Sequence, residues 1–348
     1  MNKQTRNQHL QNKIVFCSIK SVRAMGELIK TDPQRMYLLA QQPQYKTFSI
    51  PKKDGGKREI EAPNLDLKKV LGRLNRYLQS VYVFEKSSAV HGFVTSVKND
   101  ADRRSVVSNA RKHLGKSYLL NLDIKDFFHS ISREMVLSIF INAPFHFKGE
   151  LADLLADLTT FQGRLPMGTP TSPVLSNLAC RTLDEQLLDF CQQMLWSYSR
   201  YADDMSFSSN QVITNEKMYS TIAILRECGF EVNKKKMKVY GPDEAKIVTG
   251  LLVSKEKVAL APDFLKILKD DLQKLEAIVK AQQEQGQLTT HWVEQHKKQV
   301  KGRINFAGFV LGKSNPEYMQ LKSSFYSAIS PPQEEFGAMS WRGFPYNL

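Results

Sequence analysis

The stretch Trp196-Ser-Tyr-Ser-Arg-Tyr-Ala-Asp-Asp-Met-Ser-Phe-Ser-Ser209 decides the fold. Aromatic or apolar residues alternate with polar ones on both sides of Ala202-Asp203-Asp204. This alternation predicts two short strands joined by a tight turn. Because side chains at a turn are not held on opposite faces, the carboxylates of Asp203 and Asp204 can converge on one rim of the sheet.

A third carboxylate can join this pair. Residues 118–124 form a short, mostly apolar run that suits a buried strand, and Asp123 stands at its end. Clustered like charges are unfavourable unless cations lie between them. Mg²⁺ takes one or two protein carboxylates, and two such ions about 4 Å apart stabilise an in-line displacement at phosphorus. The alternative is a solvated Asp-Asp turn and a strand-end cap.

The rest of the chain interleaves helices with strands. Residues 45–50 and 59–63 predict a hairpin with a cationic tip at residues 52–58, and residues 246–258 hold one or two further strands. The segments predicted to be helical are residues 1–42, 67–84, 135–141, 151–159, 170–194, 214–228 and 263–325. This order predicts an α+β body followed by an α-helical C-terminal part.

The composition indicates a polyanionic partner. Lys and Arg together number 49 against 35 Asp and Glu, which gives a net charge of +14 in 348 residues. Nucleic acid is the commonest partner of such a chain, because binding to phosphates releases counterions. The alternative is a basic surface that serves solubility.

We expect a cytoplasmic protein without a membrane partner. The four cysteines are scattered without metal-ligand spacing, which fits a reducing compartment and predicts neither zinc nor disulfides. The first 13 residues are polar and lack the apolar core of a secretion signal. No apolar run approaches the roughly 20 residues that a membrane-spanning helix needs.

Three motifs resemble those of reverse transcriptases. Tyr201-Ala-Asp-Asp204 resembles the catalytic signature of that family, and Asn121-Leu-Asp-Ile-Lys-Asp-Phe-Phe128 is similar to the preceding aspartate motif. Leu165-Pro-Met-Gly-Thr-Pro-Thr-Ser-Pro173 looks like the loop-and-helix motif between them, and all three occur in the family's order. The resemblance implies that Asp123 and Asp203 bridge two Mg²⁺ ions, with Asp204 assisting.

The same resemblance implies a right-hand polymerase fold with fingers, a palm built on an antiparallel sheet, and an α-helical thumb. The implied boundaries are an N-terminal helical extension at residues 1–44, fingers at 45–117, palm with fingers elements at 118–250, thumb at 251–330 and a C-terminal tail at 331–348.

Residues for the incoming dNTP follow from the same resemblance. Lys52, Lys53 and Arg58 lie in the hairpin whose cations contact the triphosphate, and Phe128 stands where an aromatic ring excludes a 2′-OH. Met167 replaces the usual Gln near the nascent base pair, and Lys236 ends the segment Gly229-Phe-Glu-Val-Asn-Lys-Lys-Lys236 that resembles the next motif. Taken alone, the cationic turn and lysine run are typical of solvated surface, and the Phe-Phe pair of core packing.

Two shorter elements narrow the resemblance to retron reverse transcriptases. Asn109-Ala-Arg-Lys-His113 looks like the Asn-Ala-x-x-His element of that group, and Val248-Thr249-Gly250 resembles its Val-Thr-Gly element. The resemblance implies RNA contacts for both, and for the thumb residues Lys301 and Arg303. Without it, the first element reads as a capped turn with a surface histidine, and the thumb segment as an amphipathic helix with a basic face.

The resemblance implies an RNA-directed DNA polymerase that copies a structured non-coding RNA into a branched, RNA-linked DNA (msDNA), priming from a guanosine 2′-OH. It further implies dNTP substrates, a role in anti-phage defence and a separate effector protein as partner. Two rivals stay open at this point. One is a reverse transcriptase of group II introns or of diversity-generating elements, and the other is a non-catalytic RNA-binding scaffold with the same fold.

Overall fold

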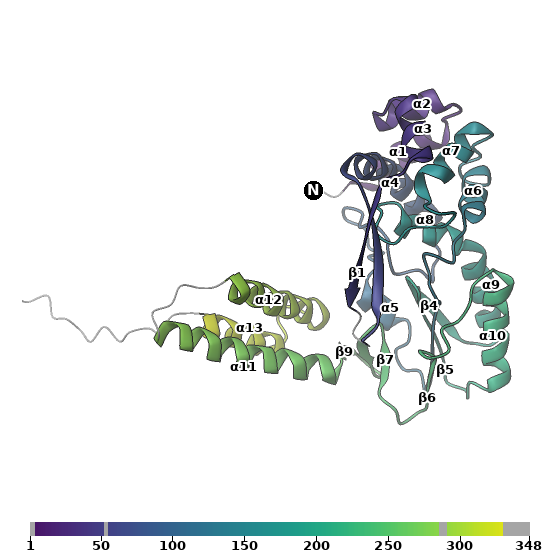
Figure 1. Cartoon of the computed structure of the whole chain (residues 1–348). Helices are drawn as coiled ribbons and strands as arrows, with labels where there is room; N and C mark the ends of the chain where they lie inside the picture. The colour runs from purple at the N-terminus through teal and green to yellow at the C-terminus, as the bar shows by residue number, and fades with distance from the viewer. Residues whose placement is uncertain (1–3, 52–54, 285–290, 330–348) are drawn as a thin grey trace, which may run out of the picture. The chain divides into compact units, whose positions relative to one another are not determined.

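A computed structural model describes residues 4–51, 55–284 and 291–329 of the chain (Figure 1). It contains helices together with antiparallel sheets, so the predicted α+β class is confirmed. The chain forms two compact units, of which the first comprises Met1–Thr249 with Val253–Lys257 and the second Gly250–Leu252 with Val258–Leu348. The predicted subdomain boundaries stay predictions, and the tail at 331–348 lies outside the described residues.

The central sheet of the first unit has four strands in the order β4-β5-β3-β6. Its members are β4 (Ser197–Tyr201), β5 (Asp204–Ser209), β3 (Tyr118–Asp123) and β6 (Lys238–Tyr240). β3 pairs antiparallel with β5, which places Asp123 opposite Asp204 at the end of the ladder. The predicted strand-turn-strand and the strand before Asp123 are therefore confirmed, whereas β6 was not predicted.

Helices cover this sheet and extend beyond it. Figure 1 shows α9 and α10 along one side of the sheet, and their buried Leu187 and Leu225 belong to the same core as Phe207 of β5. The helices of the first unit are α1 (Arg6–Cys17), α2 (Val22–Ile29), α3 (Pro33–Gln41), α4 (Leu65–Glu85), α5 (Val106–Arg111), α6 (Arg133–Ile141), α7 (Glu150–Thr159), α8 (Ser172–Ala179), α9 (Arg181–Gln193) and α10 (Asn215–Glu227).

One helix prediction was wrong in detail. The single helix predicted from residue 170 to 194 is divided into α8 and α9 at Cys180, whose ψ of 7° departs from the helical value. The division comes just before Asp184, which is buried and bonded to Arg200 of β4. Periodicity alone did not reveal this break.

The predicted hairpin is also present. β1 (Tyr45–Pro51) pairs antiparallel with β2 (Lys57–Pro63), and the Asn64 side chain then caps the first turn of α4. The buried face of α4 includes Leu67, Leu71 and Leu78, which lie in the core with Phe16 of α1.

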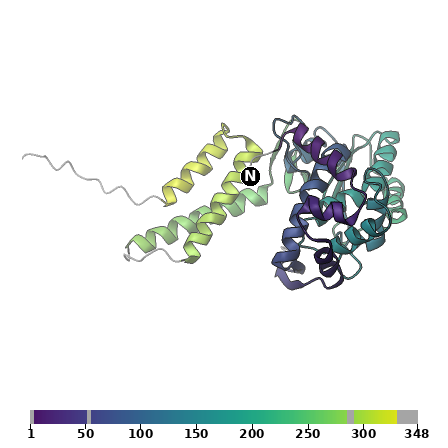
Figure 2. The same cartoon turned by 90° about the horizontal axis from the view of Figure 1, so that it is seen from above.

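The second unit is mainly helical. Its helices are α11 (Pro262–Glu284), α12 (His291–Leu311) and α13 (Pro316–Ile329), which pack on one another side by side (Figure 2). A three-stranded sheet has the order β7 (Lys246–Val248), which belongs to the first unit, then β8 (Leu251–Val253) and β9 (Val258–Leu260). The predicted helical C-terminal part is thus confirmed over the described residues.

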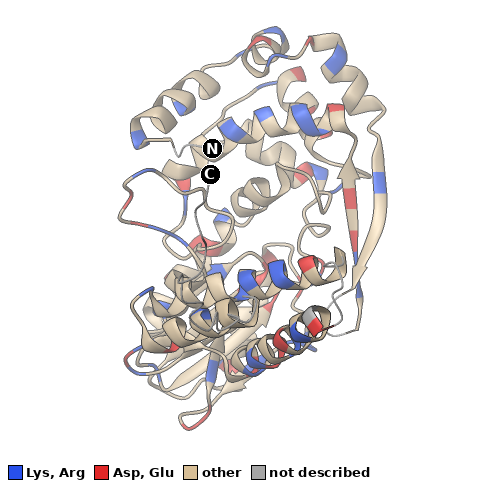
Figure 3. Ribbon diagram, turned by 90° about the vertical axis from the view of Figure 1, so that its left-hand side faces the viewer, with Lys and Arg blue, Asp and Glu red and all other residues tan. Residues whose placement is uncertain are grey.

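The distribution of charge and the apolar character of the helices bear on possible partners. Lys and Arg positions are spread over helices of both units and are not confined to one of them (Figure 3). Among the described helices, none combines the length and the apolar composition required to cross a bilayer.

Candidate active site

The three aspartates meet at one end of the central sheet. Asp203 lies in the turn between β4 and β5, where Ala202 has the left-handed φ of 59°. Asp204 begins β5 opposite Asp123, and the backbone N–H of Ile124 donates to the carbonyl of Asp203 at 3.0 Å. The antiparallel register and this hydrogen bond therefore hold Asp123, Asp203 and Asp204 together.

The cluster carries uncompensated negative charge. Burial raises the pKa of Asp203, and the negative charge of the neighbouring Asp123 carboxylate raises it further. Burial and then the charges of Asp203 and Asp123 raise the pKa of Asp204 to about 7, although part of this side chain stays exposed. Lys236 offsets some of the charge, because its Nζ donates to Asp123 Oδ2 at 2.8 Å.

The donor set suits a hard divalent cation. Carboxylate oxygens are the ligands that Mg²⁺ prefers, and raised carboxyl pKa values mark a place where a cation relieves repulsion. Within the described residues, no group of three or more His, Cys, Asp or Glu side chains is arranged as a ready-made metal cage. Mg²⁺ requires only one or two protein carboxylates, since water and substrate phosphates complete its octahedron.

A cleft of about 470 Å³ opens beside the cluster. Asp123 and Asp203 line it, and so do four of the residues predicted to bind the dNTP, namely Arg58, Phe128, Met167 and Lys236. The other two, Lys52 and Lys53, lie outside the described residues. The structure thus brings one acidic and one basic group of side chains to a single cleft, which can hold a triphosphate and its metal ions.

An aromatic group forms another wall of the cleft. The Phe128 ring lies 5.9 Å from the ring of Phe93 and 5.4 Å from that of Phe127, between ring centroids. Phe128 is only partly buried, whereas Phe127 belongs to the core. The exposed part of Phe128 is therefore available to a sugar in the cleft, and Phe127 accounts for the core packing.

Met167 is held by its backbone. Its N–H donates to Glu61 Oε2 at 3.2 Å, and its carbonyl accepts from the Glu61 N–H at 2.7 Å. Glu61 is buried and also bonds Arg164 at 2.9 Å and His129 at 3.2 Å. Gly168 makes this approach possible, because a Cβ there would lie 2.9 Å from the Glu61 carbonyl oxygen at a φ of +137°. The predicted contact of Met167 with substrate stays a prediction.

Sequence reasoning missed a buried network behind the turn that contains Asp203. Arg200 is fully buried, and its Nε and Nη2 donate to the two oxygens of Asp184 at 2.8 and 2.6 Å. Its Nη1 donates to Asn177 Oδ1 at 3.2 Å and to the carbonyl of Ala202 at 3.1 Å. A charged residue in a strand with otherwise buried neighbours was the available signal, since buried charges are almost always paired.

The Asn-Ala-x-x-His and Val-Thr-Gly elements lie close together. The Asn109 side chain donates to Thr249 Oγ1 at 2.9 Å. His113 is buried with one ring nitrogen 2.7 Å from Ser208 and the other 2.7 Å from Ser199, and burial lowers its pKa to about 3. Asn109 and His113 therefore contact protein, and Val248 is buried. Thr249 is partly exposed and Gly250 is exposed, so the RNA contact predicted for this group stays a prediction.

The two predicted thumb residues lie on α12 in the second unit. Lys301 is exposed, whereas Arg303 forms an ion pair with Asp271 of α11. The predicted contact of Lys301 and Arg303 with RNA stays a prediction.

Comparisons with known proteins agree with the geometry. The family model for "Reverse transcriptase (RNA-dependent DNA polymerase)" matches residues 50–253. The chain is 33% identical to the retron Mx65 reverse transcriptase of Myxococcus xanthus over 60% of its own length and 51% of that protein. It is 32% identical to the Escherichia coli retron Ec73 reverse transcriptase over 60% and 68% of the two chains. With the Escherichia coli retron Ec86 reverse transcriptase it shares 28% identity over 68% and 72%. The chain thus spans about half the length of the first of these relatives.

Solved structures give a weaker likeness. A telomerase from Candida albicans aligns with a TM-score of 0.46 and 12% identity over 83% of this chain and 64% of that one. A foamy viral protease-reverse transcriptase aligns with a TM-score of 0.39 and 16% identity over 84% and 46%.

Proposed function

This chain belongs to the reverse transcriptase (RNA-dependent DNA polymerase) family, with retron reverse transcriptases among its relatives, and on that premise we propose that it copies a structured RNA into DNA by two-metal nucleotidyl transfer. The proposal rests on one observation above all, which is that Asp123 and Asp203, with Asp204 paired opposite Asp123, share a cleft with Arg58 and Lys236. Acidic groups that bind metal and basic groups that bind phosphate are the two requirements of this chemistry.

Six side chains in and beside the cleft have roles in this proposal. Asp123, Asp203 and Asp204 would hold two Mg²⁺ ions, which would supply positive charge to the attacking 3′ or 2′ oxygen and to the leaving pyrophosphate. Arg58 and Lys236 hold the triphosphate oxygens, and Lys236 exchanges its bond to Asp123 for one to phosphate. Phe128 closes against the sugar and leaves no room for a 2′-OH, which selects dNTPs.

Primer extension tests the catalytic role. With an RNA template, a DNA primer, dNTPs and Mg²⁺, the wild-type protein should extend the primer. Asp203→Ala should lower the rate by about 10³-fold or more, as loss of a central group in the transition state does. Asp243→Ala, which removes a carboxylate at an exposed position, is the matched control and should extend normally. Equal activity of wild type and Asp203→Ala would sink the catalytic assignment and leave an RNA-binding scaffold.

For the retron-specific step, we propose that the enzyme recognises its cognate non-coding RNA through Thr249 and Gly250, and that the hydrogen bond from Asn109 positions Thr249. The product is a branched RNA–DNA molecule primed from a 2′-OH, which serves in anti-phage defence with a separate effector. The support for this is the retron relatives together with the exposure of Thr249 and Gly250.

This finer proposal has its own experiment. Asn109→Ala should reduce DNA synthesis on the cognate RNA about tenfold while extension of a generic primer-template changes less than twofold, because one positioning bond is lost and the cleft is intact. Sequencing of nucleic acid that co-purifies with the protein from its host identifies that RNA. An equal loss on both substrates would contradict a role in RNA recognition.

A further inference from the structure

A second cavity, of about 700 Å³, follows the solvent-facing side of α4. It is bounded by α4 itself, by Gln4 and His9 near the N-terminus, and by Thr95 and Ser96 of the segment after α4. None of the described residues that line it also lines the cleft with the aspartates. We call this cavity the α4 groove.

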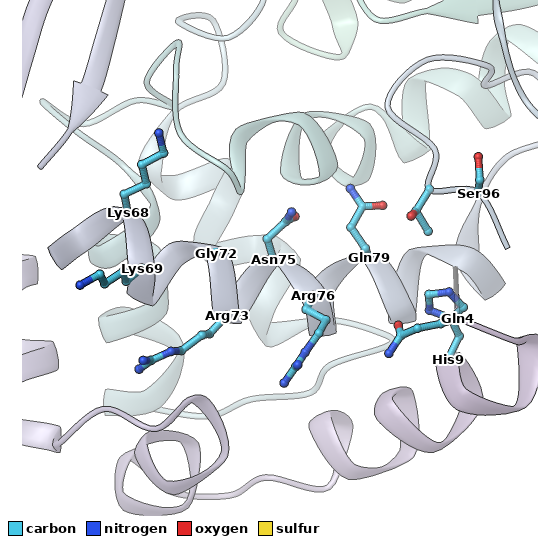
Figure 4. Close-up of a pocket in the computed structure, with 11 residues that line it drawn as sticks. Gln4, His9, Lys68, Lys69, Gly72, Arg73, Asn75, Arg76, Gln79 and Ser96 are labelled. Atoms are coloured by element: carbon cyan, nitrogen blue, oxygen red, sulfur yellow. The ribbon is translucent and has the colours of Figure 1, made fainter. Parts of the chain in front are cut away.

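Two rows of side chains border the α4 groove. Figure 4 shows Lys68, Asn75 and Gln79 on one side of α4 and Arg73 and Arg76 on the other. The sequence explains this division, because positions 68, 72, 75 and 79 follow one stripe of a helix, whereas 69, 73 and 76 follow the adjacent stripe. Gly72 keeps the space between the rows open, since a Cβ there would meet nothing within 4 Å.

The groove offers positive charge. In the part of the chain that the structure describes, the ammonium groups of Lys68 and Lys69 have no ion-pair partner. Arg73 uses Nη1 on the carbonyls of Ile29 and Lys30, which fixes the guanidinium and leaves its other nitrogens free to donate. The cationic row from residue 69 to 76 spans about 10 Å of helix, which corresponds to about three nucleotides at a rise of about 3.4 Å along the axis of a stacked strand.

His9 adds a hydrogen-bond acceptor with a defined tautomer. The Ser80 hydroxyl donates its single hydrogen to the Arg76 carbonyl at 2.9 Å, and it accepts from Asn12 at 3.2 Å. The contact of 3.0 Å between Ser80 and His9 Nδ1 therefore requires that Nδ1 carries the proton and donates. Burial lowers the pKa of His9 and keeps the ring neutral, so Nε2 is an acceptor.

That acceptor has no partner. His9 is 4% exposed, and its Nε2 is buried without a hydrogen bond in the described structure. Asn75 Oδ1 and Gln79 Oε1, which line the same groove, are also buried and unbonded. A buried polar atom without a partner costs roughly 1–3 kcal/mol, so three of them in one cavity indicate a ligand that supplies hydrogen-bond donors.

We propose that the α4 groove is a second RNA-binding site, which holds the ribose-phosphate backbone of an RNA segment outside the catalytic cleft. Phosphates bind Lys68, Lys69 and the arginine row, and a ribose 2′-OH donates to His9 Nε2. A DNA backbone has phosphates but no donor, whereas an RNA backbone carries a 2′-OH donor next to each phosphate. An acidic peptide also has backbone N–H donors, and competition with polyglutamate tests that alternative. The proposal rests on the proposed function only in taking RNA as the substrate class.

Equilibrium binding tests this site without any polymerisation. A fluorescein-labelled 12-mer of oligouridylate is titrated with the protein while an unlabelled RNA–DNA primer-template hybrid is kept at saturation to fill the cleft. The same titration uses oligodeoxythymidylate and 2′-O-methyl oligouridylate, and polyglutamate serves as a competitor. We expect RNA to bind about fivefold more tightly than either strand that lacks the 2′-OH donor, and polyglutamate to compete weakly.

Three variants locate the binding. His9→Asn keeps a donor to Ser80 but removes Nε2, and it should reduce the affinity for RNA to that for DNA. Gln79→Met removes an unpartnered group, so the free protein should be as stable as wild type or more so, while its RNA affinity falls. Lys68→Gln/Lys69→Gln should lower the salt dependence, as the slope of log K against log salt, by about 1.4. The matched control Lys217→Gln/Arg226→Gln makes the same charge change on α10 and should leave RNA binding unchanged.

The outcomes separate this site from the proposed function. Displacement of all labelled RNA by the hybrid, equal affinity for RNA and 2′-O-methyl RNA, or an equal effect of the α10 control would overturn the α4 groove as an RNA site. If His9→Asn fails to fold, Gln79→Met decides the same question. Asp203→Ala should bind RNA as the wild type does, so a failure of primer extension and a failure of groove binding are observed independently.

Discussion

Replacing Arg200 by Met should remove a large part of the stability of the first unit. Arg200 is fully buried, and its Nε and Nη2 donate to Asp184 at 2.8 and 2.6 Å. Arg200→Met leaves the Asp184 carboxylate buried, and among the described side chains the Tyr198 hydroxyl at 2.8 Å is then its one remaining donor. Loss of one partner of a buried pair costs about 3–5 kcal/mol, because the other charge stays uncompensated. At about 2–4 °C per kcal/mol for a unit of this size, the melting temperature should fall by about 10 °C.

Thermal and urea unfolding followed by circular dichroism measure this effect. The control is Arg23→Met, which removes one partner of a fully solvated pair whose side chains are 86% and 69% exposed, and it should cost less than about 0.5 kcal/mol. Arg200→Met/Asp184→Leu should be more stable than either single variant, since no unpaired charge is left. A loss in Arg200→Met no greater than in Arg23→Met, or strictly additive losses in the double variant, would refute the reasoning.

Further predictions concern the neighbourhood of the cleft and pH. Glu61→Gln removes the charge that pairs with Arg164, so the free energy of unfolding should fall by about 1–3 kcal/mol, and an unchanged urea midpoint would contradict this. Gly168→Ala places a methyl group against the Glu61 carbonyl at a φ of +137° and should lower the free energy of unfolding by about 1–3 kcal/mol. The loss should exceed that of Gly163→Ala, where the φ is +74° but nothing lies within 4 Å of the added Cβ. Equal melting temperatures of the two variants would disprove the steric reason. Because the folded pKa of His113 is about 3 against an unfolded value of 6.5, its contribution to stability is present above pH 6.5 and is lost as the pH falls toward 3. Between pH 7.5 and 5.5 this amounts to about 1.4 kcal/mol, measured by urea unfolding, and the loss should be absent in His113→Asn.

The strands and the turn that carry the three aspartates were predicted from the sequence, because each depends on the residues of its own segment. Alternation around Asp203 and Asp204 located β4, the turn and β5, and the apolar run before Asp123 located β3. The register that places Asp123 opposite Asp204 follows once these strands pair, because each must bury the same face. The strands and the turn that carry the three aspartates were therefore predictable from the two-residue alternation of strands and from one turn.

The supports of the site were not predictable in the same way. Arg200 of β4 binds Asp184 of α9, and Glu61 binds Arg164, which lies 103 positions further along the chain. No periodicity relates such partners, because the contacts arise only when helices and strands have packed. The burial of His113 was missed for the same reason. Its partners Ser199 and Ser208 lie on β4 and β5, which are far from the Asn-Ala-x-x-His element in the sequence.

At positions 9, 113 and 200, the hydrogen bonds of the buried side chains distinguish a structural role from the proposed ligand-binding role. Arg200 and His113 are buried with hydrogen bonds to protein at both ends, so their chemistry is used internally and no ligand is needed to complete it. His9 is as deeply buried, yet its Nε2 has no partner among the described residues, and His9 lines a cavity together with cationic side chains. Buried histidine therefore has a structural role at position 113 and a proposed ligand-binding role at position 9. A motif match pointed to His113 as the RNA contact, whereas hydrogen-bond accounting points to His9.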